Sequence, residues 1–135
     1  MKIIVASGPV IIENHKVLLN RHGQTEEEAR LWKFVGGKIE FSDEEDLLEN
    51  SCKREAMEEM GIKIEIIRPL KPMMIKKPGS KDDFVVLIHY LARRLTQIKP
   101  GKDIVEWGWF DLNKLPDNCA PNIQVVLQSI KKERP

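Results

Sequence analysis

Three glutamates near the middle of the chain, Glu55, Glu58 and Glu59, have the spacing of neighbours on one face of a helix. At positions i, i+3 and i+4 their Cβ atoms lie roughly 5–6 Å apart. Like charges this close repel one another and weaken the helix unless a cation lies among them. A hard divalent ion that prefers oxygen ligands, Mg²⁺ or Mn²⁺, is the natural candidate. The spacing therefore favours a metal site.

The competing interpretation is a solvated acidic face, which is the usual fate of acidic runs on helices. At about 100° per residue the glutamates cover an arc of roughly 100°. This arc overlaps the apolar stripe of the same segment, where a solvated face would lie opposite it. The stripe consists of Leu48, Cys52, Ala56 and Met60. We therefore expect the carboxylates at the rim of a buried face, where a cleft can form.

The residues around the glutamates form a recognisable motif, in which Gly37 precedes the run Arg54–Ile62, REAMEEMGI. This arrangement resembles the signature of the Nudix pyrophosphohydrolases, whose second half reads Arg-Glu-aliphatic-any-Glu-Glu-any-Gly-aliphatic. The second half matches in full. The resemblance implies the Nudix fold, an α+β domain with a mixed, curved β-sheet sandwiched between α-helices.

The first half of the motif departs from the family pattern. Its acidic position is Asp43 when counted forward from Gly37, and Asp46 when counted back from Arg54. Both are Asp where the pattern has Glu, and the stretch carries three extra residues, which we place in a loop around Phe41–Glu45. The helix is expected to begin near Asp43–Asp46 and to end at Gly61. Which of the two acids pairs with Arg54 stays open.

The resemblance also implies the activity, hydrolysis of a pyrophosphate bond by a metal-activated water. The implied metal ligands are the Gly36 carbonyl, Glu55, Glu58, Glu59 and Glu106, and one glutamate serves as general base. Arg54 is expected to clamp a neighbouring carboxylate, because its guanidinium binds such groups with two hydrogen bonds. The implied substrate contacts include Gly37, whose backbone a ligand can approach closely, and Glu40. For Glu40 and Glu106 the alternative is an exposed surface glutamate.

One aromatic and one polar residue suggest the substrate, because they resemble positions of the MutT-type branch of the family. Enzymes of that branch convert nucleoside triphosphates, including oxidised dGTP, to the monophosphate and pyrophosphate. Phe34 stands where that branch has an aromatic residue against the base, and Asn122 matches its base-reading asparagine. The plain alternatives are a core phenylalanine and a helix cap. Pro78, sixteen residues after Ile62, instead resembles the ADP-ribose pyrophosphatases. Dinucleoside polyphosphates, capped RNA ends and a non-catalytic nucleotide-binding domain stay open.

The remaining pattern supplies the elements that position these residues. Two β-branched runs with a turn at Glu13–His15 between them, and four later runs, are typical of strands. These runs are Lys2–Ile12, Lys16–Arg21, Leu31–Val35, Lys63–Ile67, Phe84–Leu95 and Ile104–Phe110. Arg21–Arg30 is expected to be a loop, Pro69–Asp83 a loop or a short edge strand, and Asn122–Lys132 an amphipathic helix. His89 alternates with apolar residues and is expected to face the core.

The composition indicates which binding partners and which cellular compartment to expect. The 135 residues suit one domain, residues 1–135, with 22 Lys and Arg against 21 Asp and Glu. A net charge of +1 does not favour a long nucleic-acid duplex, so a small-molecule nucleotide is the expected partner. No run is apolar enough for a membrane span, and Met1–Gly8 is too short for a signal sequence. The two cysteines have no paired spacing, so we expect reduced thiols and a cytoplasmic protein. A homodimer stays open.

Overall fold

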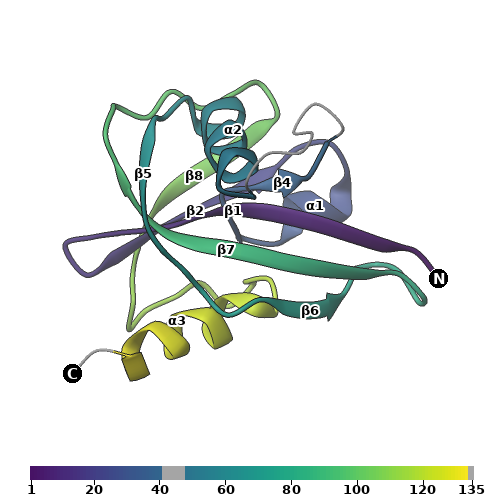
Figure 1. The fold of residues 1–135 in the computed structure, drawn as a ribbon. Helices are drawn as coiled ribbons and strands as arrows, with labels where there is room; N and C mark the ends of the chain where they lie inside the picture. Colours follow the sequence, from purple (N-terminus) through teal and green to yellow (C-terminus); the bar gives the residue numbers. More distant parts are fainter. Residues whose placement is uncertain (41–47, 134–135) are drawn as a thin grey trace.

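The computed structural model describes residues 1–40 and 48–133, which form a mixed β-sheet with helices on both sides (Figure 1). The elements in chain order are β1 (Ile3–Glu13), β2 (Lys16–His22), α1 (Glu26–Arg30), β3 (Lys33–Phe34), β4 (Gly37–Lys38), α2 (Leu48–Met60), β5 (Ile64–Pro69), β6 (Met73–Lys76), β7 (Phe84–Arg94), β8 (Ile104–Asp111) and α3 (Asn122–Glu133).

Strand β1 lies at the centre of the sheet. It runs parallel to β7, from Ile3 opposite Phe84 to Ile11 opposite Ala92, and antiparallel to β2 and β4. Strand β2 continues the sheet to β3 and β8, and β7 continues it to β5 and β6, all antiparallel. The sheet is therefore mixed, because one parallel pair stands among antiparallel ones.

The hairpin between β1 and β2 turns at Asn14 and His15, whose φ angles are 51° and 66°. Two consecutive positive φ angles match the type I′ turn, which suits the twist of an antiparallel hairpin. The turn predicted at Glu13–His15 is confirmed. It fixes the register in which Ile12 faces Val17, and with it the face to which every β2 side chain points.

The core has two parts, one on each face of the sheet. Val10, Val17 and Leu19 pack against the apolar side of α3, whereas Ile11 and Leu18 pack against α2. Side chains alternate in this way because successive Cβ atoms of a strand point to opposite faces. Figure 1 shows α2 and α3 on opposite sides of the sheet. The predicted α+β sandwich is confirmed.

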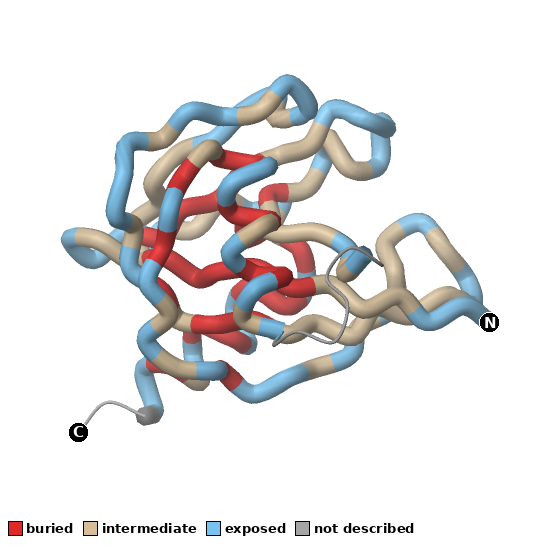
Figure 2. Tube along the Cα trace, turned by 45° about the horizontal axis from the view of Figure 1, so that its top comes forward, coloured by how far each residue is buried: buried red, intermediate tan, exposed pale blue. Residues whose placement is uncertain are grey.

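Burial is uneven along the sheet. Buried residues gather away from the N-terminus, while the N-terminal end of the molecule is only partly buried (Figure 2). Along β7, the segment Phe84–Ile88 is half-buried, and His89 and Tyr90 are buried. The half-buried stretch includes Val85 and Leu87, which line the cavity described below.

Several local predictions need correction. The segment Arg21–Arg30, expected as a loop, contains helix α1, whose N-cap Thr25 accepts a hydrogen bond from the Glu28 amide at 3.0 Å. Thr25 and Glu28 have the spacing of a capping box, a signal that was available in the sequence. Leu48 is 39% exposed, so the apolar stripe of α2 is shorter than expected.

Other predictions are refined. Strand β6 confirms the edge-strand alternative for Pro69–Asp83. Of the expected strand Leu31–Val35, Lys33–Phe34 pairs with β2 as strand β3, and Trp32 forms an isolated bridge with Cys119. The expected helix start near Asp43–Asp46 and the loop around Phe41–Glu45 lie outside the described residues. No helix within residues 1–40 and 48–133 has the length and apolar character that crossing a membrane requires.

Candidate active site

Helix α2 ends at Gly61, as predicted, and presents its glutamates at the rim of its buried face. Gly61 has φ +64° and its amide donates to the Met57 carbonyl at 2.9 Å, the usual arrangement of a glycine that ends a helix. Glu55 and Glu59, one turn apart, are 6% and 8% exposed. Glu58 lies outward and its side chain is 55% exposed. The predicted position at the rim of the buried face is confirmed.

The glycine pair before α2 crosses β1 at very close range. Gly36 has φ +154°, and a Cβ there would lie 2.5 Å from the Ser7 carbonyl oxygen. A Cβ on Gly8 would in turn overlap the Val35 carbonyl. Because these residues lack side chains, the backbone of Gly36 and Gly37 reaches the carboxylates of α2.

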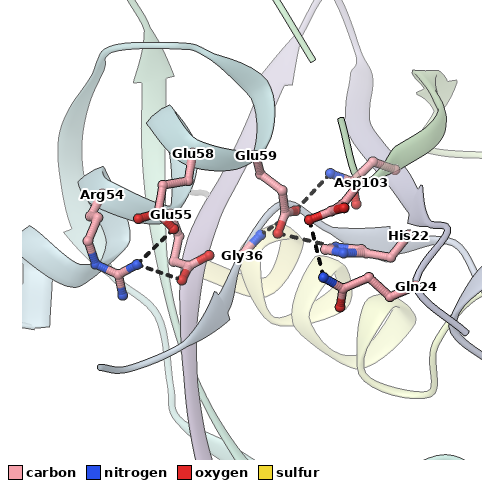
Figure 3. A network of polar contacts seen from close by, with 9 residues as sticks. His22, Gln24, Gly36, Arg54, Glu55, Glu58, Glu59 and Asp103 are labelled. Carbon is pink, nitrogen blue, oxygen red and sulfur yellow. Dashed lines mark hydrogen bonds and ion pairs between the residues drawn. The ribbon is translucent and has the colours of Figure 1, made fainter. Parts of the chain in front are cut away.

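Arg54 lies beside Glu55 and Glu58, to one side of Gly36 (Figure 3). Its Nη1 lies 3.0 Å from Glu55 Oε1 and 3.0 Å from Glu58 Oε2, and 3.8 Å from Glu40 Oε1. Its Nη2 donates to the Lys38 carbonyl at 3.2 Å. Arg54 thus clamps neighbouring acids, as expected. Asp43 and Asp46, between which its partner was left open, lie outside the described residues.

The same three acids could hold a cation. One carboxylate oxygen each from Glu40, Glu55 and Glu58 lies within 4.8 Å of the others. Burial raises the pKa of Glu55 to about 7, Arg54 opposes this shift, and the charges of Glu59 and Glu58 add to it. A buried carboxyl among other carboxylates favours a positive charge beside it. An all-oxygen donor set of this kind suits Mg²⁺ or Mn²⁺.

Glu59 belongs to a second group, on the other side of Gly36 (Figure 3). Its Oε1 accepts hydrogen bonds from Asn20 Nδ2 at 2.8 Å and from the Gly36 amide at 3.0 Å. Its Oε2 lies 3.2 Å from His22 Nε2. Asn20 and His22 are two residues apart on β2 and share the face of Leu18, which packs against α2.

This second group is electrostatically coupled. Burial acts to lower the pKa of His22, but the hydrogen bond and the charge of Glu59 outweigh it, so the pKa is raised. Both oxygens of Glu59 therefore have polar hydrogen partners within the protein. Glu59 holds β2, α2 and the Gly36 backbone together, whereas Glu55 and Glu58 are bridged by Arg54.

Asp103 is a carboxylate of the cavity that sequence reasoning missed. Its Oδ2 accepts from Gln24 Nε2 at 3.2 Å, and its carbonyl accepts from the Gly23 amide at 2.8 Å. Asp103 lines the cavity together with Gln24 and Glu59. Its one sequence signal is an acidic residue in the turn directly before β8.

Glu106, the expected further ligand, is not brought to the other carboxylates. It pairs with Arg21 across β2 and β8, and its side chain is 51% exposed. Glu106 shares a strand face with Phe110, which packs in the α3 part of the core. The alternation of β8 therefore directs Glu106 to the face opposite α2, and it is not among the described residues that line the cavity.

Another part of the cavity lining is aromatic and polar. Phe34, His89 and Asn122 are each 5–6% exposed and all line the cavity, which has a volume of about 610 Å³ and also reaches Glu55, Glu58 and Glu59. The rings of Phe34 and His89 are 5.0 Å apart and meet edge to face. Asn122 Nδ2 lies 3.3 Å from His89 Nε2, so its side chain contacts β7 from the start of α3. The inward-facing His89 is confirmed.

The predicted site residues are thus brought together with one exception. A single cavity joins the glycines Gly36 and Gly37, the acids Glu40, Glu55, Glu58 and Glu59, and the pair Phe34 and Asn122. Arg54 bridges three of the acids. Glu106 lies elsewhere, and Asp103 is added.

Comparison with known proteins gives an independent view of this chain. The family model described as NUDIX domain matches residues 2–129. No match was found among curated proteins. A MutT NUDIX hydrolase from Burkholderia pseudomallei has a similar structure, with a TM-score of 0.83 and 22% identity over 96% of this chain and 99% of that chain.

Two further solved structures resemble the chain. A MutT protein from Methanosarcina mazei Go1 superposes with a TM-score of 0.81 at 19% identity, over 98% of this chain and 95% of that chain. An ADP-ribose pyrophosphatase from Streptococcus suis 89-1591 gives a TM-score of 0.67 at 18% identity, over 98% and 92% of the two chains. At these identities the likeness shows a shared fold.

Proposed function

This chain belongs to the Nudix family and is a pyrophosphohydrolase, and we propose that it hydrolyses a nucleoside triphosphate, such as oxidised dGTP, to the monophosphate and pyrophosphate. The observation that carries the proposal is that one cavity of about 610 Å³ joins the carboxylates of α2 to Phe34 and Asn122. A volume of this size suits a nucleotide. The acids lie where a phosphate chain would react, and the aromatic and amide side chains lie where a base would bind.

We propose Mg²⁺ or Mn²⁺ as the cofactor, held by Glu55 and Glu58 with Glu40. The fit rests on the donor set, because these carboxylate oxygens lie within 4.8 Å of one another and Glu55 is buried among them. The Gly36 carbonyl and Glu59 are the further ligands expected from the family signature. A bound divalent ion neutralises phosphate charge and lowers the pKa of a coordinated water.

The protein's own side chains then supply the remaining steps. Water attacks phosphorus, the bridging P–O bond breaks, and pyrophosphate leaves with the bond's electrons while a carboxylate takes the water proton. Glu59 is poorly placed as that base, since both of its oxygens already contact Asn20, Gly36 and His22. Glu55 or Glu58 is therefore the proposed base, and Arg54 holds both acids in position.

The charge of the cavity suits an anionic substrate. Lysines also line it, namely Lys33, Lys38, Lys77 and Lys102. A cavity lined by both lysines and acids attracts a phosphate chain while keeping a place for a cation. The convergence of Glu55 and Glu58 on Arg54 argues against a non-catalytic nucleotide-binding domain.

ADP-ribose is the second candidate substrate, and one observation favours it. Pro78, the position that resembles ADP-ribose pyrophosphatases, lines the same cavity beside Lys77. An ADP-ribose molecule carries a pyrophosphate between two ribose groups, so the cavity would have to hold a second sugar near Pro78. The two candidates differ in their products and can be separated directly.

The test is a substrate panel of dGTP, 8-oxo-dGTP, ADP-ribose and a diadenosine polyphosphate, with products measured with and without Mg²⁺. We expect Mg²⁺-dependent release of pyrophosphate from a nucleoside triphosphate as the fastest reaction. Faster release of AMP and ribose 5-phosphate from ADP-ribose would favour the second candidate. No hydrolysis of any member, with nucleotide binding intact, would support a non-catalytic domain.

A further inference from the structure

A chain of three polar groups ends at the base side of the cavity, and the hydrolytic chemistry above does not use two of them. His89 Nδ1 lies 3.1 Å from the Gly8 carbonyl oxygen on β1. His89 Nε2 lies 3.3 Å from Asn122 Nδ2 on α3. His89 and Asn122 are 6% and 5% exposed, so neither hydrogen bond competes with bulk water.

The chemistry of the partners fixes the proton on the His89 ring. A backbone carbonyl only accepts hydrogen bonds, so Nδ1 must carry the hydrogen that faces Gly8. Burial lowers the pKa of His89 to about 4, so the ring is neutral at pH 7. A neutral ring with its hydrogen on Nδ1 has only a lone pair at Nε2.

That lone pair determines the orientation of the Asn122 amide. Of the two ends of the amide, only the NH₂ group can donate to Nε2, since the carbonyl oxygen would face a second lone pair. The oxygen Oδ1 therefore points away from His89. It is the acceptor that Asn122 can offer to a ligand in the cavity that it lines.

We propose that His89 is a positioning residue for substrate recognition, which holds the Asn122 amide so that Oδ1 accepts a hydrogen bond from an N–H group on the edge of a nucleobase. This inference rests on the proposed function. The ring of His89 also contacts Phe34 edge to face at 5.0 Å between centroids. One side chain thus links the aromatic surface for the base to the amide that reads the base edge.

The alternative is a core histidine that only satisfies buried polar groups. Both roles predict a loss of stability when His89 is replaced, so stability alone does not separate them. They differ in base discrimination, because only a positioning role links His89 to the choice among bases. They also differ in coupling, because a positioning residue acts through Asn122.

The first test is made on the wild-type protein and requires no nucleotide. Nuclear magnetic resonance of protein labelled with ¹⁵N histidine reports which ring nitrogen carries the proton. At pH 7 we expect a neutral His89 ring with its hydrogen on Nδ1. A hydrogen on Nε2, or a charged ring, would overturn the proposal, because Asn122 would then turn its oxygen toward His89.

The second test measures binding by calorimetry with GMP, AMP, CMP, UMP and ribose 5-phosphate. The discrimination ratio is the Kd of the most weakly bound nucleoside monophosphate divided by the Kd of the most tightly bound one. In His89→Leu we expect this ratio to fall about tenfold from its wild-type value. His89→Gln should keep part of the ratio, since its side-chain oxygen can accept from Asn122. In an Asn122→Ala background, His89→Leu should change the ratio no further.

Leu91→Ala is the matched control, because Leu91 lies on the same strand and packs in the α3 part of the core, but its side chain cannot form a hydrogen bond with Asn122. It should lower stability and keep the wild-type ratio. A wild-type ratio in His89→Leu would overturn the positioning role alone. Failure of the wild-type protein to bind any nucleoside monophosphate would overturn the proposed function and the base-reading role with it. If His89→Leu does not fold, His89→Gln and the ring measurement decide.

Discussion

The backbone of Gly37 lies against the carboxylate of Glu55, so that a Cβ at position 37 would overlap that group. Gly37 comes from a short strand paired with β1, and Glu55 from the buried edge of α2. Because Gly37 has no side chain, the Glu55 carboxylate can lie directly against its backbone.

Replacement of Gly37 by alanine tests this relationship. The added methyl group meets the far end of a flexible side chain, so we expect the fold to remain and Glu55 to be displaced. A displaced catalytic group costs about a hundredfold in turnover. The control is Gly108→Ala on β8, where a Cβ would lie in ordinary contact with the Phe110 ring at 3.6 Å and, its chain neighbours apart, with no other described residue within 4 Å. Equal activity in both variants would contradict the role of Glu55.

Replacement of Glu58 by glutamine separates activity from stability. The side chain is 55% exposed, so its loss should change the free energy of unfolding by less than about 0.5 kcal/mol. Turnover with Mg²⁺ should fall on the order of a hundredfold. Glu65→Gln is the control, because Glu65 is also 55% exposed and also pairs with an arginine, but on β5 away from the cavity. Near-normal turnover in Glu58→Gln would show that the site is wrongly assigned.

Replacement of Glu59 by glutamine should affect stability as well. The amide nitrogen of glutamine would face one of the donors from Asn20, Gly36 or His22, and a buried donor without an acceptor costs about 1–3 kcal/mol. Urea unfolding at pH 7 measures this cost directly. A variant as stable as Glu58→Gln would contradict the structural part of its role.

Asp103 and Glu106 are the two candidates for a further carboxylate that acts together with the glutamates of α2. Asp103 lines the cavity, whereas Glu106 pairs with Arg21 on the face of the sheet opposite α2. We therefore expect Asp103→Asn to lower Mg²⁺-dependent turnover, and to raise the Mg²⁺ concentration needed for half activity, by a larger factor than Glu106→Gln. The reverse order would restore the role that the family resemblance implied for Glu106.

The stability of the protein should depend on pH through His89. Its pKa is lowered from 6.5 to about 4, so between these values the unfolded chain binds a proton that the folded protein excludes. The contribution of the neutral His89 ring to the free energy of unfolding is fully present above pH 6.5. It is lost as the pH falls through the folded pKa near 4, by about 3 kcal/mol in total. The measurement is urea unfolding of wild type and His89→Gln at pH 7 and pH 4.5. A difference between the two proteins that does not change with pH would contradict the buried neutral ring.

Local sequence determined much of this protein. The hairpin turn after β1 follows from a short polar segment between apolar strands, and helix α2 places Glu55, Glu58 and Glu59 on neighbouring positions. These features depend on contacts within about one turn or one hairpin, so spacing alone predicts them. The same holds for α1, whose capping pattern at Thr25 and Glu28 is also local.

The tertiary structure decided what each acid contacts. Glu59 became a buried acceptor because Asn20 and His22, more than thirty residues away in sequence, share one face of β2. Glu106 was directed away from α2 by the pairing of β8 with β2, and Asp103 entered the cavity from a turn. The link from Gly8 through His89 to Asn122 joins two strands and a helix. Side-chain spacing fixes neighbours within an element, but strand register and layer packing fix which elements meet, and these depend on the whole chain.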